Sequence, residues 1–190
     1  LAARNLGAAS SLGAVLPAAA VFPAHVGFDA AASPVSSHGP WGVLQLAGDA
    51  HFDAARVAAG IQFDAHRVHG TRLRLQPIDV RFSGAASPVA LARRFDARDQ
   101  LDALASDLAP KVAGLVGLLV PPVLGLERAE QARVALREAL GIDVVETLAH
   151  LPSVPGIRLQ RALDAATQQA GVTWVGEVAR LCEQGGVLVA

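Results

Sequence analysis

The feature that most constrains the fold is a regular alternation of short apolar runs with amphipathic helical segments. Residues 114–120 are almost continuously apolar, as expected for a strand that is covered on both faces. Residues 127–140 follow with apolar side chains at helical spacing and end at Gly141, and residues 142–148 are apolar again. A strand, a helix and a second strand in this order predict a parallel βαβ unit with a right-handed crossover.

The same alternation continues on either side of this unit. Further strands are predicted at 41–48, 71–80 and 172–182, and a last short strand from Val187 onward. Further helices are predicted after Asp49, after Asp99 and after the Pro155-Gly156 pair. The sequence therefore predicts an α/β fold with a mostly parallel sheet of βαβ units, and a terminal β-hairpin.

The 127–140 helix is expected to bury Ala132, Ala135, Leu136, Ala139 and Leu140. Three more apolar faces are predicted. The first is formed by Phe52, Ala55, Ala59 and Phe63, and the second by Leu101, Leu104, Ala105 and Leu108. The third is formed by Leu159, Ala162, Leu163, Ala166 and Ala170. Residues 6–40 show no clean period, and only a short strand near Val15 is expected there.

Composition excludes several classes of function. Sixteen basic and seventeen acidic residues give a formal net charge of −1, so no basic face for nucleic acid is expected. Cys182 is the single cysteine, which excludes a disulfide framework and a thiolate metal cluster within this chain. His66 and His69 lie three residues apart with His51 nearby, and a solvated helix end explains them better than a metal site does. No metal is therefore predicted.

Two uncharged stretches resemble membrane or targeting signals. Residues 6–28 follow Arg4 and are rich in alanine, but prolines and glycines interrupt them. A true secretory signal is the alternative, and it would make the chain a secreted binding protein. Residues 112–126 are too short to cross a bilayer and contain a Pro-Pro pair. The chain begins with Leu1 and ends in a strand-like run, so it is expected to be an interior piece of a longer protein.

Residues 151–160 form the candidate site that is visible in the sequence. A predicted strand leads through a proline- and glycine-containing turn into a helix, where free amides favour anions. Gly156 would let the backbone approach a ligand, and Arg158 could contact a phosphate or carboxylate in a bidentate manner. The alternatives are an ordinary loop with Arg158 in solvent, or an ion pair between Arg158 and Asp164 or Glu146.

Four segments of the chain resemble the B-subunit family of anaerobic glycerol-3-phosphate dehydrogenase in their order and spacing. These segments are residues 46–55, 91–96, 119–126 and 151–160. The last is the most specific, because that family carries a very similar P-S-V-x-G-I-R-L-Q run. Ser11, Leu12 and Gly13 also fall where the family has a short loop of the T-A-L-G type.

The resemblance implies part of a flavin-dependent dehydrogenase that oxidises glycerol 3-phosphate to dihydroxyacetone phosphate and passes electrons toward quinone. It implies FAD or FMN in the full-length protein, with Arg158 as the catalytic residue. Cofactor contacts are implied for Gly13, Gly156, Gly176 and Val178. The implied partners are a companion flavoprotein subunit and a membrane-associated iron–sulfur subunit. The implied location is the cytoplasm, peripheral to the inner membrane through those partners.

The resemblance also implies that the chain is divided into three parts. Residues 1–40 would border the flavin domain, residues 41–155 would form an intervening substrate-side α/β domain, and residues 156–190 would return to the flavin domain through a helix and the hairpin. The family's N-terminal G-x-G-x-x-G turn and its C-terminal glycine-rich segment are missing from this sequence. The isolated chain is therefore expected to bind no flavin tightly. The alternative is a non-catalytic α/β module of the same ancestry that binds a ligand or a partner.

Overall fold

The computed structural model describes most of the chain. The described residues are 6–9, 11–18, 28–29, 39–47, 49, 52–70, 72–81, 87–148, 152–172, 182–184 and 187–189. The chain forms two compact units, Leu1–Arg158 and Leu159–Ala190.

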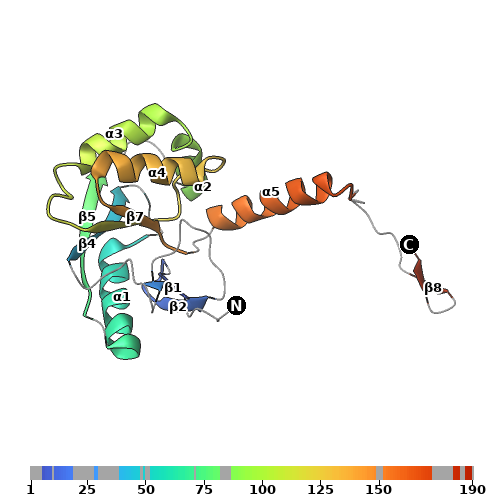
Figure 1. Cartoon of the computed structure of the whole chain (residues 1–190), viewed down its shortest axis with the longest axis horizontal. Helices are drawn as coiled ribbons and strands as arrows, with labels where there is room; N and C mark the ends of the chain where they lie inside the picture. The colour runs from blue at the N-terminus through green and yellow to red at the C-terminus, as the bar shows by residue number, and fades with distance from the viewer. Residues whose placement is uncertain are drawn as a thin grey trace. The chain divides into compact units, whose positions relative to one another are not determined.

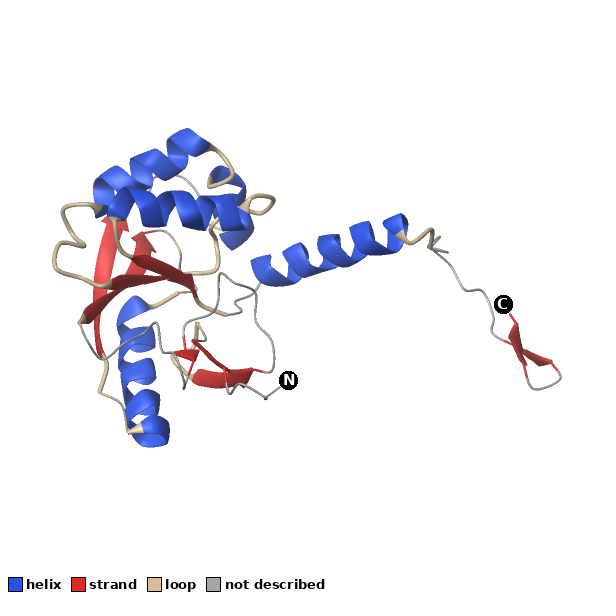
Figure 2. Cartoon of the chain, viewed as in Figure 1, coloured by secondary structure: helices blue, strands red, loops and turns tan. Residues whose placement is uncertain are grey.

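The first unit is built on a four-stranded sheet in which every strand pair is parallel (Figures 1 and 2). The strands are β4 (Pro40–Ala47), β5 (Arg74–Arg81), β6 (Gly117–Val120) and β7 (Asp143–Glu146). Their order is β5-β4-β6-β7, so the chain leaves β4 on one side and later returns to its other side with β6. The predicted α/β fold with a mostly parallel sheet is confirmed.

Helices cover both faces of this sheet (Figure 1). One face packs against α1 (Ala54–His69), and the other packs against α2 (Pro88–Arg94), α3 (Arg98–Leu108) and α4 (Ala129–Leu140). Because side chains alternate along a strand, β4 contributes side chains to the hydrophobic cores on both faces of the sheet. Trp41 and Val43 belong to the α1 core, whereas Leu44 and Leu46 belong to the core beneath α3 and α4.

The predicted face of α3 agrees with the structure, and the predicted face of α4 agrees in part. All four predicted residues of α3 are buried: Leu101, Leu104, Ala105 and Leu108. In α4, Ala132, Ala135 and Leu136 are buried and Leu140 is partly buried, but Ala139 is exposed. Gly141 ends the helix in the left-handed conformation with φ of 67°.

Of the predicted α1 face only Phe52, which directly precedes the N-cap, is buried, and the rest of the predicted face is wrong. Its buried residues are Ala54, Val57, Ala58, Ile61 and Ala65. Ala55, Ala59 and Phe63 are exposed, and Phe63 retains 67% of its accessible surface. An alanine-rich helix offers two apolar stripes, and the stripe with Val57 and Ile61 removes more apolar area from water. The N-cap is Asp53, whose carboxylate accepts a hydrogen bond from Arg56 N–H, and not Asp49.

Three short antiparallel strands precede the main sheet, in the order β2-β1-β3. They are β1 (Leu6–Ala9), β2 (Val15–Ala18) and β3 (Phe28–Asp29). The strand expected near Val15 is confirmed, whereas β1 and β3 were not predicted, because strands this short leave no clear period. Among the described residues, no helix is long and apolar enough to cross a membrane.

The helix α5 (Val154–Gln169) crosses the boundary between the two units, and the second unit also contains the hairpin of β8 (Cys182–Gln184) and β9 (Val187–Val189). The predicted terminal hairpin is confirmed. The predicted strand at 172–182 lies mostly outside the described residues. The predicted burial of Leu159, Ala162, Leu163, Ala166 and Ala170 is wrong, because no described element of this unit covers that face of α5.

Candidate functional site

The candidate site surrounds residues 121–128, which connect β6 to α4 and are called the β6–α4 loop below. The loop follows the carboxyl end of β6, beside the point where the strand order reverses between β4 and β6. Ligands bind at such switch points in open α/β sheets. Residues 121–126 of the loop are all buried, so the loop itself fills the space near the ends of β6 and β7.

Glu146 is the buried acid of this site. It is the last residue of β7, and alternation along the strand places it on the same face as Val144, toward α4. Its side chain is fully buried. One carboxylate oxygen, Oε1, accepts a hydrogen bond from the backbone N–H of Leu124 at 2.7 Å. Because a buried carboxylate is costly unless it is paired and hydrogen-bonded, Glu146 requires further donors.

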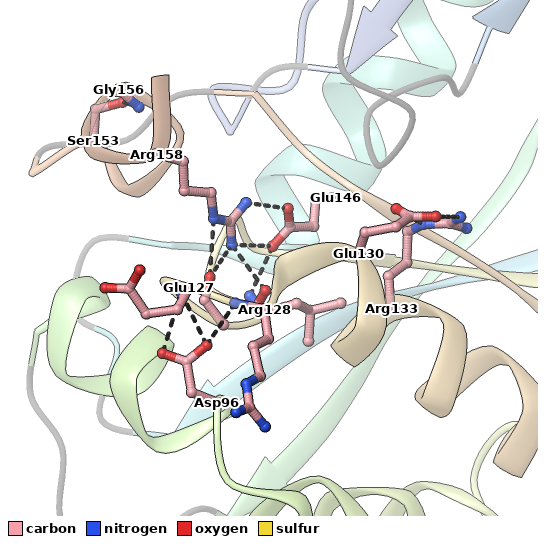
Figure 3. A network of polar contacts seen from close by, with 11 residues as sticks. Asp96, Glu127, Arg128, Glu130, Arg133, Glu146, Ser153, Gly156 and Arg158 are labelled. Carbon is pink, nitrogen blue, oxygen red and sulfur yellow. Dashed lines mark hydrogen bonds and ion pairs between the residues drawn. The ribbon is translucent and has the colours of Figure 1, made fainter. Parts of the chain in front are cut away.

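Arg158 supplies those donors from the second turn of α5 (Figure 3). Its Nη1 lies 2.6 Å from Oε2 of Glu146, and its Nη2 lies 3.1 Å from Oε1, which is a bidentate ion pair. The guanidinium also donates to the carbonyl oxygens of Leu124 and Gly125, at 2.6–2.9 Å. The Arg158 side chain is only 14% exposed. Of the ion-pair alternatives weighed from the sequence, the structure shows the pair with Glu146.

The first turn of α5 holds Arg158 in this position. The hydroxyl of Ser153 accepts a hydrogen bond from Gly156 N–H at 3.0 Å, which satisfies an amide at the start of the helix. Val154 is fully buried and packs with Ala92 of α2 and Leu126 of the β6–α4 loop. Polar and apolar contacts therefore fix the same end of α5 against the loop.

Asp96 holds the opposite end of the β6–α4 loop from the turn between α2 and α3. Its Oδ1 accepts hydrogen bonds from the N–H groups of Glu127 at 3.0 Å and Arg128 at 2.9 Å (Figure 3). Arg128 occupies the N-cap position of α4 and forms no side-chain cap of its own. Asp96 thus performs the capping role for α4 from a distant segment. Sequence analysis missed Asp96, because an aspartate in a turn carries no signal of a partner 31 or 32 residues away.

Gly125 allows the loop to pass close to Asp96. Its φ is +72°, a conformation that side-chain-bearing residues rarely adopt. A Cβ atom at this position would lie 2.8 Å from Asp96 Oδ1 and 3.1 Å from the carbonyl carbon of Arg128. The same residue presents its carbonyl oxygen to Arg158. The loop conformation therefore depends on glycine at this point.

A second ion pair lies within the first turns of α4. Arg133 Nη2 is 2.6 Å from Glu130 Oε1, and Arg133 Nε is 3.0 Å from Oε2. The hydrogen bonds from Arg133 lower the pKa of Glu130, although partial burial opposes this shift. The same hydrogen bonds raise the pKa of Arg133. Glu130 is 51% exposed, so solvent screens this pair more than it screens the pair of Glu146.

The predicted cofactor contacts lie in different parts of the chain. Gly13, with φ of +84°, packs against α1, and a Cβ there would lie 3.0 Å from the carbonyl oxygen of Arg56. The neighbouring Ser11 N–H donates to the carbonyl oxygen of Leu148 at 2.9 Å, just beyond β7. Gly156 shares the first two turns of α5 with Arg158, as the sequence predicts. Gly176 and Val178 lie outside the described residues.

Four of the five described helix starts offer fewer free amides to the pyrophosphate of a dinucleotide, whereas α3 has no side-chain cap. Such a group needs free backbone amides at the N-terminus of a helix. First-turn or N-cap amides of α1, α2, α4 and α5 already donate to side chains of this chain, namely Asp53, Ser87, Asp96 and Ser153. Among the described residues, no group of three His, Cys, Asp or Glu side chains could hold a metal ion.

Comparison with known proteins gives one relevant similarity. No family model matches the chain, and no solved structure matches it. The chain is 30% identical over 150 residues to the B subunit of anaerobic glycerol-3-phosphate dehydrogenase from Yersinia enterocolitica serotype O:8 / biotype 1B (strain NCTC 13174 / 8081). The match covers 75% of this chain and 35% of that relative. Most of this chain is thus similar to about one third of a glycerol-3-phosphate dehydrogenase subunit.

Proposed function

We propose that the chain is part of a flavin-dependent dehydrogenase subunit that oxidises glycerol 3-phosphate to dihydroxyacetone phosphate and passes electrons toward quinone. The observation that carries this proposal is the 30% identity to the B subunit of a glycerol-3-phosphate dehydrogenase over 75% of the chain. The parallel α/β fold with a switch point between β4 and β6 is compatible with a substrate-side domain of such a protein.

In this proposal the chain contributes to the substrate side, and FAD or FMN is held mainly by other parts of the full-length protein. The side-chain-bound amides at the starts of α1, α2, α4 and α5 support this division. The proposed partners are a companion flavoprotein subunit and a membrane-associated iron–sulfur subunit. The proposed location is the cytoplasmic side of the inner membrane.

Arg158 has a restricted role in the proposed chemistry. Its Nε, Nη2 and one N–H of Nη1 are directed at Glu146, Leu124 and Gly125. One Nη1 N–H has no acceptor among the described residues, and this group could contact the phosphate of a substrate. We therefore infer that Arg158 acts mainly as a positioning residue for the β6–α4 loop, with at most one direct contact to an anion.

A second candidate function is a non-catalytic α/β module that binds a partner or a ligand. The buried β6–α4 loop favours this candidate, because it occupies the space over β6 and β7 where an open ligand cleft is expected. In that case the similarity to the dehydrogenase reflects shared ancestry alone.

The experiment uses the complete protein that contains this chain. Purified protein is assayed for reduction of an artificial electron acceptor that depends on glycerol 3-phosphate, and its bound flavin is measured after gel filtration. The proposal predicts activity and retained flavin in the complete protein, and no retained flavin in the 190-residue chain alone. Retained flavin without activity on glycerol 3-phosphate would contradict the proposal that glycerol 3-phosphate is the substrate. A colourless and inactive complete protein would favour the non-catalytic binding module.

Arg158→Lys in the complete protein separates the roles of this residue. A higher KM for glycerol 3-phosphate at unchanged kcat, flavin content and Tm indicates direct contact with the substrate anion. A lower Tm with proportionate loss of activity indicates the positioning role. Arg56→Ala is the matched control, since Arg56 is an exposed arginine of α1.

A further inference from the structure

We propose that a groove between α3 and α4 binds a small organic anion, at a site separate from the proposed dehydrogenase chemistry. The groove has a volume of about 310 Å³ and lies within the first unit. Asp96 and Arg128 line it, and the Arg128 side chain points away from Glu146 (Figure 3). This volume is at the lower end of the range for small-molecule sites, so the ligand must be small.

The floor of the groove is apolar. It is formed by Phe95 and Leu101 from the α2–α3 region and by Ala132 and Ala135 from α4. The two alanines fill little volume where α4 faces α3, so space remains above them. Such a floor favours a ligand with an aromatic or short aliphatic body.

The rim of the groove carries two guanidinium groups. Arg128 donates its backbone N–H to Asp96, and its side chain has no partner among the described residues. Arg98 is paired with Asp102 at 2.9 Å, but their side chains are 68% and 56% exposed, so this pair is weak and can be exchanged for a ligand.

Asp96 is the one acidic residue that lines the groove. Its carboxylate already accepts the N–H groups of Glu127 and Arg128, which offset its charge. The rim is therefore positive toward a ligand. A guanidinium matches the oxygens of a carboxylate or a phosphate, so the expected ligand has an oxyanion head and an apolar body.

The test is a titration of the 190-residue chain followed by NMR or calorimetry. Phenyl phosphate and 3-phenylpropionate represent the two sources of such an anion, while inorganic phosphate and benzyl alcohol each lack one half of the ligand. The proposal expects at least one of the two organic anions to bind roughly tenfold more tightly than either half-ligand. The tighter of the two organic anions then shows whether the groove prefers a phosphate or a carboxylate head group.

Three variants locate the binding. Arg128→Ala should weaken binding of the preferred anion by roughly tenfold, because a charge-assisted hydrogen bond is lost. Gln131→Trp should block it, since Gln131 is an exposed residue of the groove. Arg56→Ala removes the same charge from α1 and should leave binding unchanged. Melting curves that match the parent chain establish that the three variants are folded.

Four results would overturn the proposal. The first is no binding of either organic anion at millimolar concentration. The second is binding of inorganic phosphate or benzyl alcohol as tight as that of the organic anions, which would show that the ligand does not require both an oxyanion head and an apolar body. The third is an equal loss in Arg56→Ala and Arg128→Ala, which would indicate a general charge effect. The fourth is unchanged binding in Gln131→Trp, which would place the ligand elsewhere.

Discussion

Two arginine–glutamate pairs lie on the side of the sheet that faces α4, and they differ in their surroundings. Arg133 and Glu130 are three residues apart on one helix, and Glu130 is half exposed. Arg158 and Glu146 come from a helix and a strand, with a fully buried carboxylate. In the first pair only Glu130 is open to water, because Arg133 is 16% exposed and also donates to the carbonyl oxygen of Val144. The second also binds the backbone of the β6–α4 loop, so its loss would leave buried polar groups without partners.

The contrast shows that burial, rather than distance, decides what an ion pair does here. The shortest N–O distance is 2.6 Å in both pairs. Water can solvate Glu130 when Arg133 is removed, whereas it cannot reach Glu146 without opening the loop. An arginine–glutamate ion pair therefore adds little to stability on the surface of α4, whereas the buried pair fixes the loop at the carboxyl end of the sheet.

The largest predicted effect is that of Arg158→Ala. It leaves the Glu146 carboxylate buried without its cation, and we expect a loss of roughly 3–5 kcal/mol in the free energy of unfolding. Urea unfolding of the 190-residue chain measures this loss, with Glu130→Gln as the control that breaks the exposed pair. Similar losses in the two variants would remove the distinction between the pairs.

Gly125→Ala tests whether the buried pair needs the loop in this conformation. Because φ is positive and the new Cβ would meet Asp96 Oδ1, we expect a loss of about 1–3 kcal/mol. Gly70→Ala is the control, since Gly70 also has positive φ but nothing lies within 4 Å of its Cβ position. Equal losses at both positions, measured by thermal unfolding, would mean that only backbone strain matters.

Asp96→Ala removes the acceptor of two amides at the start of α4. We expect a loss of about 1 kcal/mol, as for other helix caps, and partial recovery with Asp96→Asn, which keeps one acceptor oxygen. Hydrogen exchange of the Glu127 and Arg128 amides is the local measurement. Unchanged exchange in Asp96→Ala would show that the carboxylate does not hold the loop.

The smallest predicted effect concerns pH and the exposed pair. The pKa of Glu130 is lowered in the folded chain, so the pair stabilises the fold above the ordinary glutamate pKa of about 4.3. This stabilisation, about 0.5 kcal/mol after screening by solvent, is lost as pH falls through the lowered value. The difference in unfolding free energy between the parent chain and Glu130→Gln should therefore shrink as pH falls below the ordinary glutamate range and vanish once Glu130 is protonated in the folded chain. A difference that persists after this protonation would contradict the assignment.

Local sequence patterns predicted the main sheet, the face of α3 and part of the face of α4, but not α2. The four buried positions of α3 follow from spacing alone. The face of α1 was predicted wrongly because alanine is compatible with either side of a helix, and only contact with Trp41 and Val43 selects one. The burial of the apolar face of α5 was predicted wrongly for a related reason. Residue spacing alone does not show whether another element packs against that face.

The site was less accessible to sequence analysis than the fold. Arg158 stood out because it follows the Pro155-Gly156 pair, which lies in the first turn of α5 rather than in a turn before it. Glu146, twelve residues earlier, could be considered as its partner. The carbonyls that Arg158 also binds lie 33 and 34 residues away, and no local pattern connects them. Asp96 is equally remote from the amides that it binds. Such contacts arise from the path of the loop, which periodicity does not specify.

A double-mutant cycle on Glu146 and Arg158 tests the central claim that the two residues act as one unit. Glu146→Gln, Arg158→Met and the double variant are unfolded in urea beside the parent chain. Because each single change removes the oppositely charged partner of a buried group, we expect a coupling energy of about 1.5–3 kcal/mol, with the double variant less destabilised than the sum of the single ones. Losses that add to within about 0.5 kcal/mol would contradict the claim.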